Sequence, residues 1–181
     1  MKSWKFILII VAVILAVVFM FVFAFQGVQN KAINLEEQIT TAQSEIEIQQ
    51  KRRADLIPSL VDCVKAYDKH EYKILMDVVA ARGASSDEAV SEVATRINVV
   101  AEAYPELKSS TNYQQLMTEL SVTENLIAQT RTNYNTWVTQ YKSYVRKFPN
   151  RGILSILGYE VQNFEKLTFN TSEDAYTNLF D

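Results

Sequence analysis

Residues 6–25 read FILIIVAVILAVVFMFVFAF, twenty apolar residues in a row. At about 1.5 Å per residue, a helix of this length spans about 30 Å, the thickness of the hydrocarbon core of a bilayer. A cleaved signal peptide has a shorter apolar region, about 7–15 residues, and then a pair of small residues at the cleavage site. Residues 24–27, Ala-Phe-Gln-Gly, lack that pair. Residues 1–27 are therefore predicted to form an uncleaved transmembrane anchor.

The charges on either side of the anchor bear on its orientation. Lys2 and Lys5 precede the apolar run, and only Lys31 follows it closely. Because lysine and arginine favour the cytoplasmic side of a membrane, this count places the N-terminus inside and the rest of the chain outside. The margin is one lysine, so the count alone leaves the orientation open.

The composition restricts the fold and the partners of the remaining chain. The 181 residues allow about one domain of ordinary size, and they include only 4 glycines and 3 prolines. An all-β fold needs many turns, so this scarcity favours long helices. The net charge of −3 gives the molecule no overall electrostatic attraction to nucleic acid. The single cysteine excludes an intramolecular disulfide.

A helical repeat begins shortly after the anchor. One row of positions recurs at alternating steps of four and three residues, the spacing of one helix face, over more than five heptads. The row comprises Leu35, Ile39, Ala42, Ile46, Gln49, Arg53, Leu56, Leu60, Cys63, Tyr67, His70 and Ile74. It is narrow as far as Ile46, which is typical of a two-stranded coiled coil. From Leu56 a second apolar row widens it, which is typical of the core of a helical bundle.

The change in width predicts two consecutive segments of helix. Residues 28–48, with the narrow row, are predicted to form a helical stalk that self-associates. Residues 49–82, with the broad face, are predicted to form the first helix of a bundle. Gly83 supplies the expected C-terminal stop, because glycine commonly ends helices.

Helix signals continue through the rest of the chain. Ser85 and Glu88 have the spacing of a capping box, and they start a second helix that ends before Pro105. Asn112 is expected to cap a third helix, which is broken at residues 148–152. The segment after this break is predicted to form either a short fourth helix or an irregular apolar strap.

The predicted fold class is all-α. An N-terminal transmembrane helix continues into a long helix, followed by an antiparallel bundle of three long helices and a short C-terminal helix. The predicted parts are the anchor at 1–27, the stalk at 28–48, the bundle at 49–166 and a C-terminal tail at 167–181.

Three cations stand in a row at residues 51–53, within the first bundle helix. Arg53 falls on the apolar row, and Arg52 lies beside it. A cation placed among helices needs carboxylates opposite it, because an unpaired buried charge is costly. Glu119 and Glu124 flank the apolar row of the third helix. We therefore predict that Arg52 and Arg53 pair with Glu119 or Glu124 and so join the first helix to the third.

Pro58 lies inside the same predicted helix. Proline has no backbone N–H, so it frees the carbonyl group of Ala54 from the helical ladder at a cost of about 3 kcal/mol. The apolar phase nevertheless continues unbroken from Leu56 to Leu60. We therefore expect the helix to kink at Pro58 and not to end there.

The third helix carries an unusually dense aromatic row. Its members are Tyr134, Trp137, Tyr141, Tyr144 and Phe148. Core packing against the first helix is the interpretation that we favour. The alternative is a partner-binding surface formed by Tyr134, Trp137, Tyr141 and Tyr144, since tyrosine and tryptophan are enriched at interface hot spots. The sequence leaves both interpretations open.

Catalytic and metal-binding patterns are missing from the sequence. Cys63 and His70 are seven residues apart, which in one helix is about 10.5 Å, whereas a Cys–His hydrogen bond needs about 3 Å. One histidine and one cysteine also fall short of the four ligands usual for zinc. We therefore predict no catalytic residue, no metal site and no cofactor, and we expect that the protein is not an enzyme.

Four segments together resemble the LemA family of bacterial membrane proteins. They read KRRADLIPSLVDCVKAYDKHE, AYPELKSS, LMTELSVTENLIAQTRTNYN and FPN. The resemblance implies one N-terminal membrane helix, a helical-bundle domain and an uncharacterised molecular function. It also implies that the domain is cytoplasmic, against the lysine count, so the orientation stays open. The positions that define the family are Arg52, Arg53, Asp55, Pro58, Glu124, Arg131, Tyr134 and Asn135, and Arg131 joins the predicted ion-pair network on this basis.

Two functions follow as expectations. The first is a scaffold in the bacterial inner membrane, with a single pass, that self-associates through its stalk and transmembrane helix. Other membrane or envelope proteins are further expected partners, and nucleic acid is not. The alternative is a module that binds an anionic ligand or lipid head group through Arg52, Arg53 and Arg151.

Overall fold

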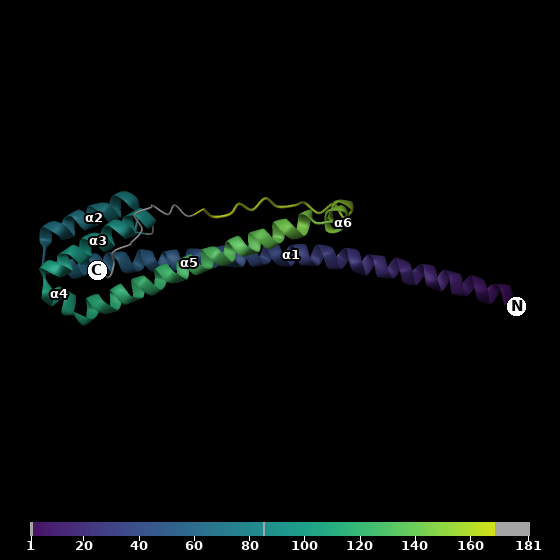
Figure 1. Ribbon diagram of the computed structural model, residues 1–181, viewed down its shortest axis with the longest axis horizontal. Coiled ribbons are helices and arrows are strands. Elements are labelled where there is room, and N and C mark those ends of the chain that lie inside the picture. The colour runs from purple at the N-terminus through teal and green to yellow at the C-terminus, as the bar shows by residue number, and fades with distance from the viewer. Residues whose placement is uncertain (1, 85, 169–181) are drawn as a thin grey trace. The chain divides into compact units, whose positions relative to one another are not determined.

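The computed structural model describes residues 2–84 and 86–168. Over these residues the fold is all-α and contains no strand, which confirms the predicted fold class. Ser85 and most of the predicted tail lie outside the described residues. The helices are α1 (Lys2–Val64), α2 (Lys69–Arg82), α3 (Asp87–Ala103), α4 (Pro105–Ser109), α5 (Thr111–Arg146) and α6 (Asn150–Ile156) (Figure 1).

The chain divides into two compact units. The first, here called the anchor unit, comprises Met1–Thr41 and Tyr134–Asp181. The second, the bundle unit, comprises Ala42–Asn133. The helices α1 and α5 each supply residues to both units, because each continues across a unit boundary.

The core of the bundle unit is formed by apolar faces of α1, α2, α3, α4 and α5. α2 and α3 pack against each other, as Figure 1 shows. Burial of these side chains stabilises the fold by about 25 cal/mol per Å² of apolar surface removed from water. The buried core residues are Ile57, Leu60, Val61, Val64, Leu75, Val90, Val93, Ile97, Val100, Ala101, Leu107, Tyr113 and Leu120.

The helix α1 continues through Pro58 to Val64. The continuous apolar phase across the proline therefore indicated correctly that the helix does not end there. The Ser59 hydroxyl donates to the Asp55 carbonyl oxygen at 3.2 Å. This bond lies in the same turn as Pro58, which has no backbone N–H of its own to donate. A kink at Pro58 stays a prediction.

The first bundle helix was predicted to continue to residue 82, and this is wrong. α1 ends at Val64, and α2 begins at Lys69. The reason is Asp68, whose carboxylate accepts from the backbone N–H groups of His70 and Glu71 and so caps a new helix. The predicted stop at Gly83 is confirmed, because Gly83 is the C-cap of α2 with a φ of 81°.

Two predicted helix starts differ from the structure. Ser86 caps α3, since its hydroxyl accepts from the Ala89 N–H at 3.2 Å, whereas the predicted cap Ser85 is outside the described residues. Asn112 does not cap α5. The helical ladder already begins with the bond from the Gln114 N–H to the Ser110 carbonyl, so Asn112 lies within the first turn.

Pro105 starts a short helix that the sequence analysis missed. It occupies the first turn of α4, where its fixed φ suits a helix and its missing N–H has no intrahelical partner to lose. The C-terminal segment combines the two forms that were predicted as alternatives. α6 comes first, and residues 157–168, here called the strap, then form no regular secondary structure.

Candidate functional site

Arg53 is a buried cation in the bundle unit. Its side chain is only 1% exposed, and its Nη1 lies 2.7 Å from Asp87 Oδ1. The same nitrogen lies 3.2 Å from both carboxylate oxygens of Glu124. Two carboxylates on different helices therefore surround this guanidinium group, which is the arrangement that a buried charge requires.

Asp87 is shared with a second arginine. Arg131 Nη1 donates to Asp87 Oδ2 at 3.0 Å, and Arg131 Nη2 donates to Asp87 Oδ1 at 3.3 Å. Burial acts to raise the pKa of Asp87, but hydrogen bonds from Arg131 and Arg53 outweigh it, so the pKa lies below its ordinary value. Arg53, Arg131, Asp87 and Glu124 form what we call the arginine–carboxylate network, whose formal charge is zero.

The structure brings together most residues of the predicted ion-pair network. Arg53 forms an ion pair with Glu124. Arg131 forms its ion pair with Asp87, which also contacts Arg53. Arg52 Nη2 lies 3.6 Å from Glu119 Oε2, but both side chains are about half exposed, so this pair contributes little to stability. Asp87 was missed, because in the sequence it is one acidic residue in a polar loop before a helix.

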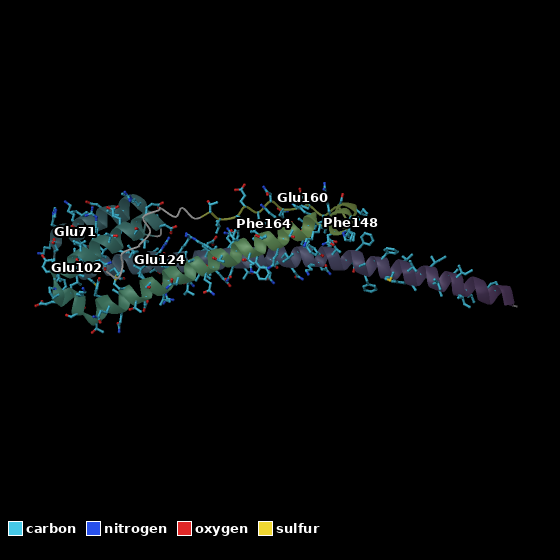
Figure 2. The ribbon with its side chains drawn as sticks, in the orientation of Figure 1. Glu71, Glu102, Glu124, Phe148, Glu160 and Phe164 are labelled. Atoms are coloured by element: carbon cyan, nitrogen blue, oxygen red, sulfur yellow. The ribbon has the colours of Figure 1, made fainter. Side chains whose placement is uncertain are left out.

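A second cluster lies in the anchor unit. Tyr141 of α5 is fully buried and donates to Glu36 Oε1 of α1 at 2.8 Å. Tyr159 donates to the same oxygen, and the two tyrosine oxygens are 3.1 Å apart. The Gln162 N–H donates to the Tyr141 oxygen at 2.9 Å, and the ring of Phe164, which Figure 2 labels, packs edge-on against Tyr141. Burial, together with the Glu36 carboxylate, raises the pKa of both tyrosines, so both stay protonated donors.

The strap is held along α5 by further hydrogen bonds. The Tyr134 hydroxyl donates to the Glu165 carbonyl oxygen at 3.1 Å. The Asn135 side-chain amide donates to the Leu167 carbonyl oxygen and accepts from the Leu167 N–H, both at 2.8 Å. Asn135 thereby pairs with the strap backbone as a neighbouring β-strand would.

The aromatic row is therefore used largely within the chain. Tyr134 and Tyr141 are buried, and Trp137 and Tyr144 are half-buried. The Tyr144 hydroxyl donates to the Val28 carbonyl oxygen at 3.2 Å. A partner-binding surface on these residues stays a prediction, and it would have to use the parts of them that the strap and α1 leave exposed.

Cys63 and His70 are on different helices, because of the break before α2. The prediction that both residues lie on one helix face is therefore wrong. Cys63 is half-buried, its thiol donates to the Ser59 carbonyl oxygen, and it accepts from the Asn112 amide, both at 3.4 Å. Burial, and then the charge of Asp62, raises the pKa of this thiol. His70 is exposed in the first turn of α2.

The apolar start of α1 stands out from the rest of the chain. Among the described residues, α1 is the one helix long and apolar enough to cross a membrane, and the rest of the protein buries none of its apolar stretch. These features define a class of all-α proteins in which an N-terminal apolar helix continues into a helical bundle. The sequence profile of the LemA family matches residues 42–177, and the chain belongs to the LemA family.

A relative supports this assignment. The chain is 25% identical to the protein LemA of Metamycoplasma hominis over 171 residues. The matched region covers 84% of this chain and 78% of that protein. Membership of this family accounts for the helical architecture and assigns no reaction to the chain.

Proposed function

We propose that the protein is a membrane-anchored helical scaffold that self-associates through its anchor. The observation that carries the proposal is the continuity of α1 from Lys2 to Val64. Its first part is the apolar span, and its last two turns supply core residues of the bundle unit, from Ile57 to Val64. One helix thus joins a membrane segment to a folded interaction module.

The apolar row of the stalk is engaged within the chain. Its members Leu35, Ile39, Ala42 and Ile46 are all buried in the single chain. This burial disfavours a coiled coil between copies at the stalk. The side chains of the span from Leu8 to Phe23 are exposed, so we place self-association there. In lipid, helices associate where small residues let backbones approach, and Ala12 and Ala16 lie four residues apart on one face.

Binding of an anionic ligand is the weaker alternative. Arg53 is held between Asp87 and Glu124, so an anion would have to displace a carboxylate to reach it. Arg52 belongs to the bundle unit and Arg151 to the anchor unit. The three arginines therefore do not form a single site within either unit.

Subunit counting tests the scaffold proposal. The full-length chain, with one fluorophore on each copy, is reconstituted in lipid bilayers at low density, and photobleaching steps are counted. We expect two or more steps for most spots. The pair Ala12→Ile and Ala16→Ile should shift the count towards one, and the matched pair Val13→Ile and Val17→Ile should not. Single steps for the unaltered protein at every density would refute self-association.

Crosslinking tests the other part of the proposal. Crosslinking of the intact protein in its own membrane, followed by identification of what is captured, should recover specific membrane or envelope proteins. A variant with an unrelated span in place of residues 6–25 separates partners of the anchor from partners of the folded part. Recovery of lipid-embedded proteins in proportion to their abundance alone would count against a scaffold.

A further inference from the structure

The corner where α5 turns into α6 exposes large apolar side chains. Phe148 is 94% exposed and Ile156 is 77% exposed, and Leu157 follows directly. All three residues lie within residues 146–157, here called the corner. Single exposed apolar residues are normal on soluble proteins, so exposure alone does not indicate a binding surface. Charge and position have to decide what covers them.

The charge around the corner has one sign. Between Glu124 and Glu160 the sequence contains no acidic residue. The same stretch contains five cations, at Arg131, Lys142, Arg146, Lys147 and Arg151. Three of these five belong to the corner, and all three are exposed. The corner therefore combines apolar side chains with three exposed cations and has no acidic residue of its own, although the whole chain has a net charge of −3.

The position of the corner follows from contacts within the anchor unit. Tyr141 bonds to Glu36, and Tyr144 bonds to the Val28 carbonyl oxygen, so α5 runs antiparallel to α1 in this unit. The helix α5 ends at Arg146, two residues beyond Tyr144 and about 3 Å further along. The same distance along α1 from Val28 leads back to about residue 26, directly after the apolar run. The corner therefore begins level with the end of the span, and Figure 2 shows its residue Phe148 beside α6.

We propose that the corner docks on the same bilayer that α1 spans. Phe148 and Ile156 enter the interface between head groups and acyl chains, and Arg146, Lys147 and Arg151 bind anionic phospholipid head groups. Aromatic side chains favour this interface, and arginine and lysine reach head groups while their alkyl stems stay in the apolar layer. A lipid surface is preferred to a protein partner because the apolar residues stand at the level where the span leaves the bilayer.

The contribution of each cation is measurable. A lysine or arginine near an anionic surface contributes enough to change the ratio of docked to undocked corner by about fivefold. This effect depends on lipid charge and falls with salt, since exposed charges are screened beyond a Debye length. Apolar insertion by Phe148 and Ile156 does not require anionic lipid. The proposal thus predicts one part of docking that depends on lipid charge and one part that does not.

Label depth in reconstituted full-length protein tests the proposal. In a Cys63→Ser background, Ile156→Cys carries an environment-sensitive fluorophore, and nitroxide-bearing lipids quench it according to its depth. The matched control is Glu165→Cys on the strap, which is exposed and lies level with Tyr134, about 18 Å along α5 from Arg146 at the start of the corner. We expect several-fold stronger quenching at 156 than at 165. Equal quenching at the two positions would overturn the proposal.

A second arm separates the lipid charge from the apolar contact. In vesicles that contain phosphatidylglycerol, changing Arg146, Lys147 and Arg151 to glutamine should lower the docked-to-undocked ratio by at least fivefold. A control with Lys69, Lys73 and Lys108 changed to glutamine removes the same charge from exposed positions of the bundle unit and should leave the ratio unchanged. Equal effects of the two sets would overturn the head-group contact. Phe148→Ser should weaken quenching at 156 in neutral phosphatidylcholine too, and no effect would overturn the apolar contact.

The docking proposal depends on the anchor and is independent of self-association. The depth measurement reports on each copy separately, whereas photobleaching counts copies. A monomeric protein with a deeply quenched corner would refute the scaffold's self-association and support docking. An oligomer with a solvent-exposed corner would do the reverse.

Discussion

Removing a carboxylate from the arginine–carboxylate network should cost more stability than removing the buried arginine itself. Glu124→Gln leaves the Arg53 guanidinium, 1% exposed, with Asp87 as its remaining carboxylate of the network. Breaking a buried pair from one side typically costs about 3–5 kcal/mol. One carboxylate remains, and the Glu124 side chain is 39% exposed, so we expect about 2 kcal/mol.

Arg53→Met should cost less. It removes the buried charge and keeps most of the side-chain volume. The two carboxylates that it leaves are accessible to water, since the Asp87 and Glu124 side chains are 55% and 39% exposed, and Asp87 keeps Arg131. Replacement of a buried ion pair by apolar groups is often close to neutral. We therefore expect a loss of at most about 1 kcal/mol, less than for Glu124→Gln.

Urea unfolding of the full-length chain in detergent micelles measures these changes, with helicity followed by circular dichroism. The apolar span keeps its helix in the micelle, because unpaired backbone groups are costly in an apolar phase, so the signal lost on unfolding reports the rest of the chain. The double variant Arg53→Met with Glu124→Gln should be more stable than Glu124→Gln alone. A larger loss for Arg53→Met than for Glu124→Gln would refute the reasoning, as would a double variant whose losses simply add.

Three further predictions concern single groups. The pKa of Asp87 is lower in the folded state than in the unfolded state. The carboxylate therefore stabilises the fold above its unfolded pKa, and this stabilisation is lost as the pH falls through its folded pKa. Asp87→Asn should therefore reduce the pH dependence of the free energy of unfolding below about pH 4. Tyr141→Phe removes the acceptor of the Gln162 N–H and should lower the free energy of unfolding by about 1 kcal/mol. Hydrogen exchange should become faster at the Gln162 amide and stay unchanged at the Gln114 amide, which bonds to the Ser110 carbonyl. Asn135→Ala removes both bonds to Leu167 and should speed exchange at the Leu167 amide, whereas the same substitution at the exposed Asn133 should not.

The sequence predicted the features that depend on a helical period. The row from Leu35 onward identified the buried face of α1, and the phase across Pro58 showed that the helix continues. Arg53 was recognised as an inward cation because it occupies a position on this row. In each case the neighbours that matter lie one or two turns away in the same helix, where spacing alone defines the geometry.

The same periodicity concealed the break between α1 and α2. Tyr67, His70 and Ile74 continue the row in phase. Tyr67, and Leu75 of α2, pack in the same core as the end of α1, so the period of burial continues across the break. The signal that could have revealed the break is Asp68, a good N-cap with Glu71 three residues later, which is close to the capping-box pattern. A pattern of burial therefore outweighed a local cap signal that was correct.

Contacts made by segments without a period could not be predicted. Asp87 reaches Arg53 and Arg131 only because the bundle places the start of α3 against α1 and α5. The strap bonds to Tyr134 and Asn135 through its backbone groups, which every residue has. No pattern of side chains in the strap could therefore predict these bonds.

Charge shows the limit of averages over a whole chain. A net charge of −3 gives no reason to expect nucleic-acid binding, but it hides a stretch from 125 to 159 with five cations and no acidic residue. In the bundle unit the cation Arg53 is neutralised by Asp87 and Glu124, so it adds nothing to the outward field. The cations of the corner are exposed, and they stand where the span ends. It is therefore the location of these exposed cations relative to the apolar run, and not the sum of charges, that supports the proposed docking on lipid.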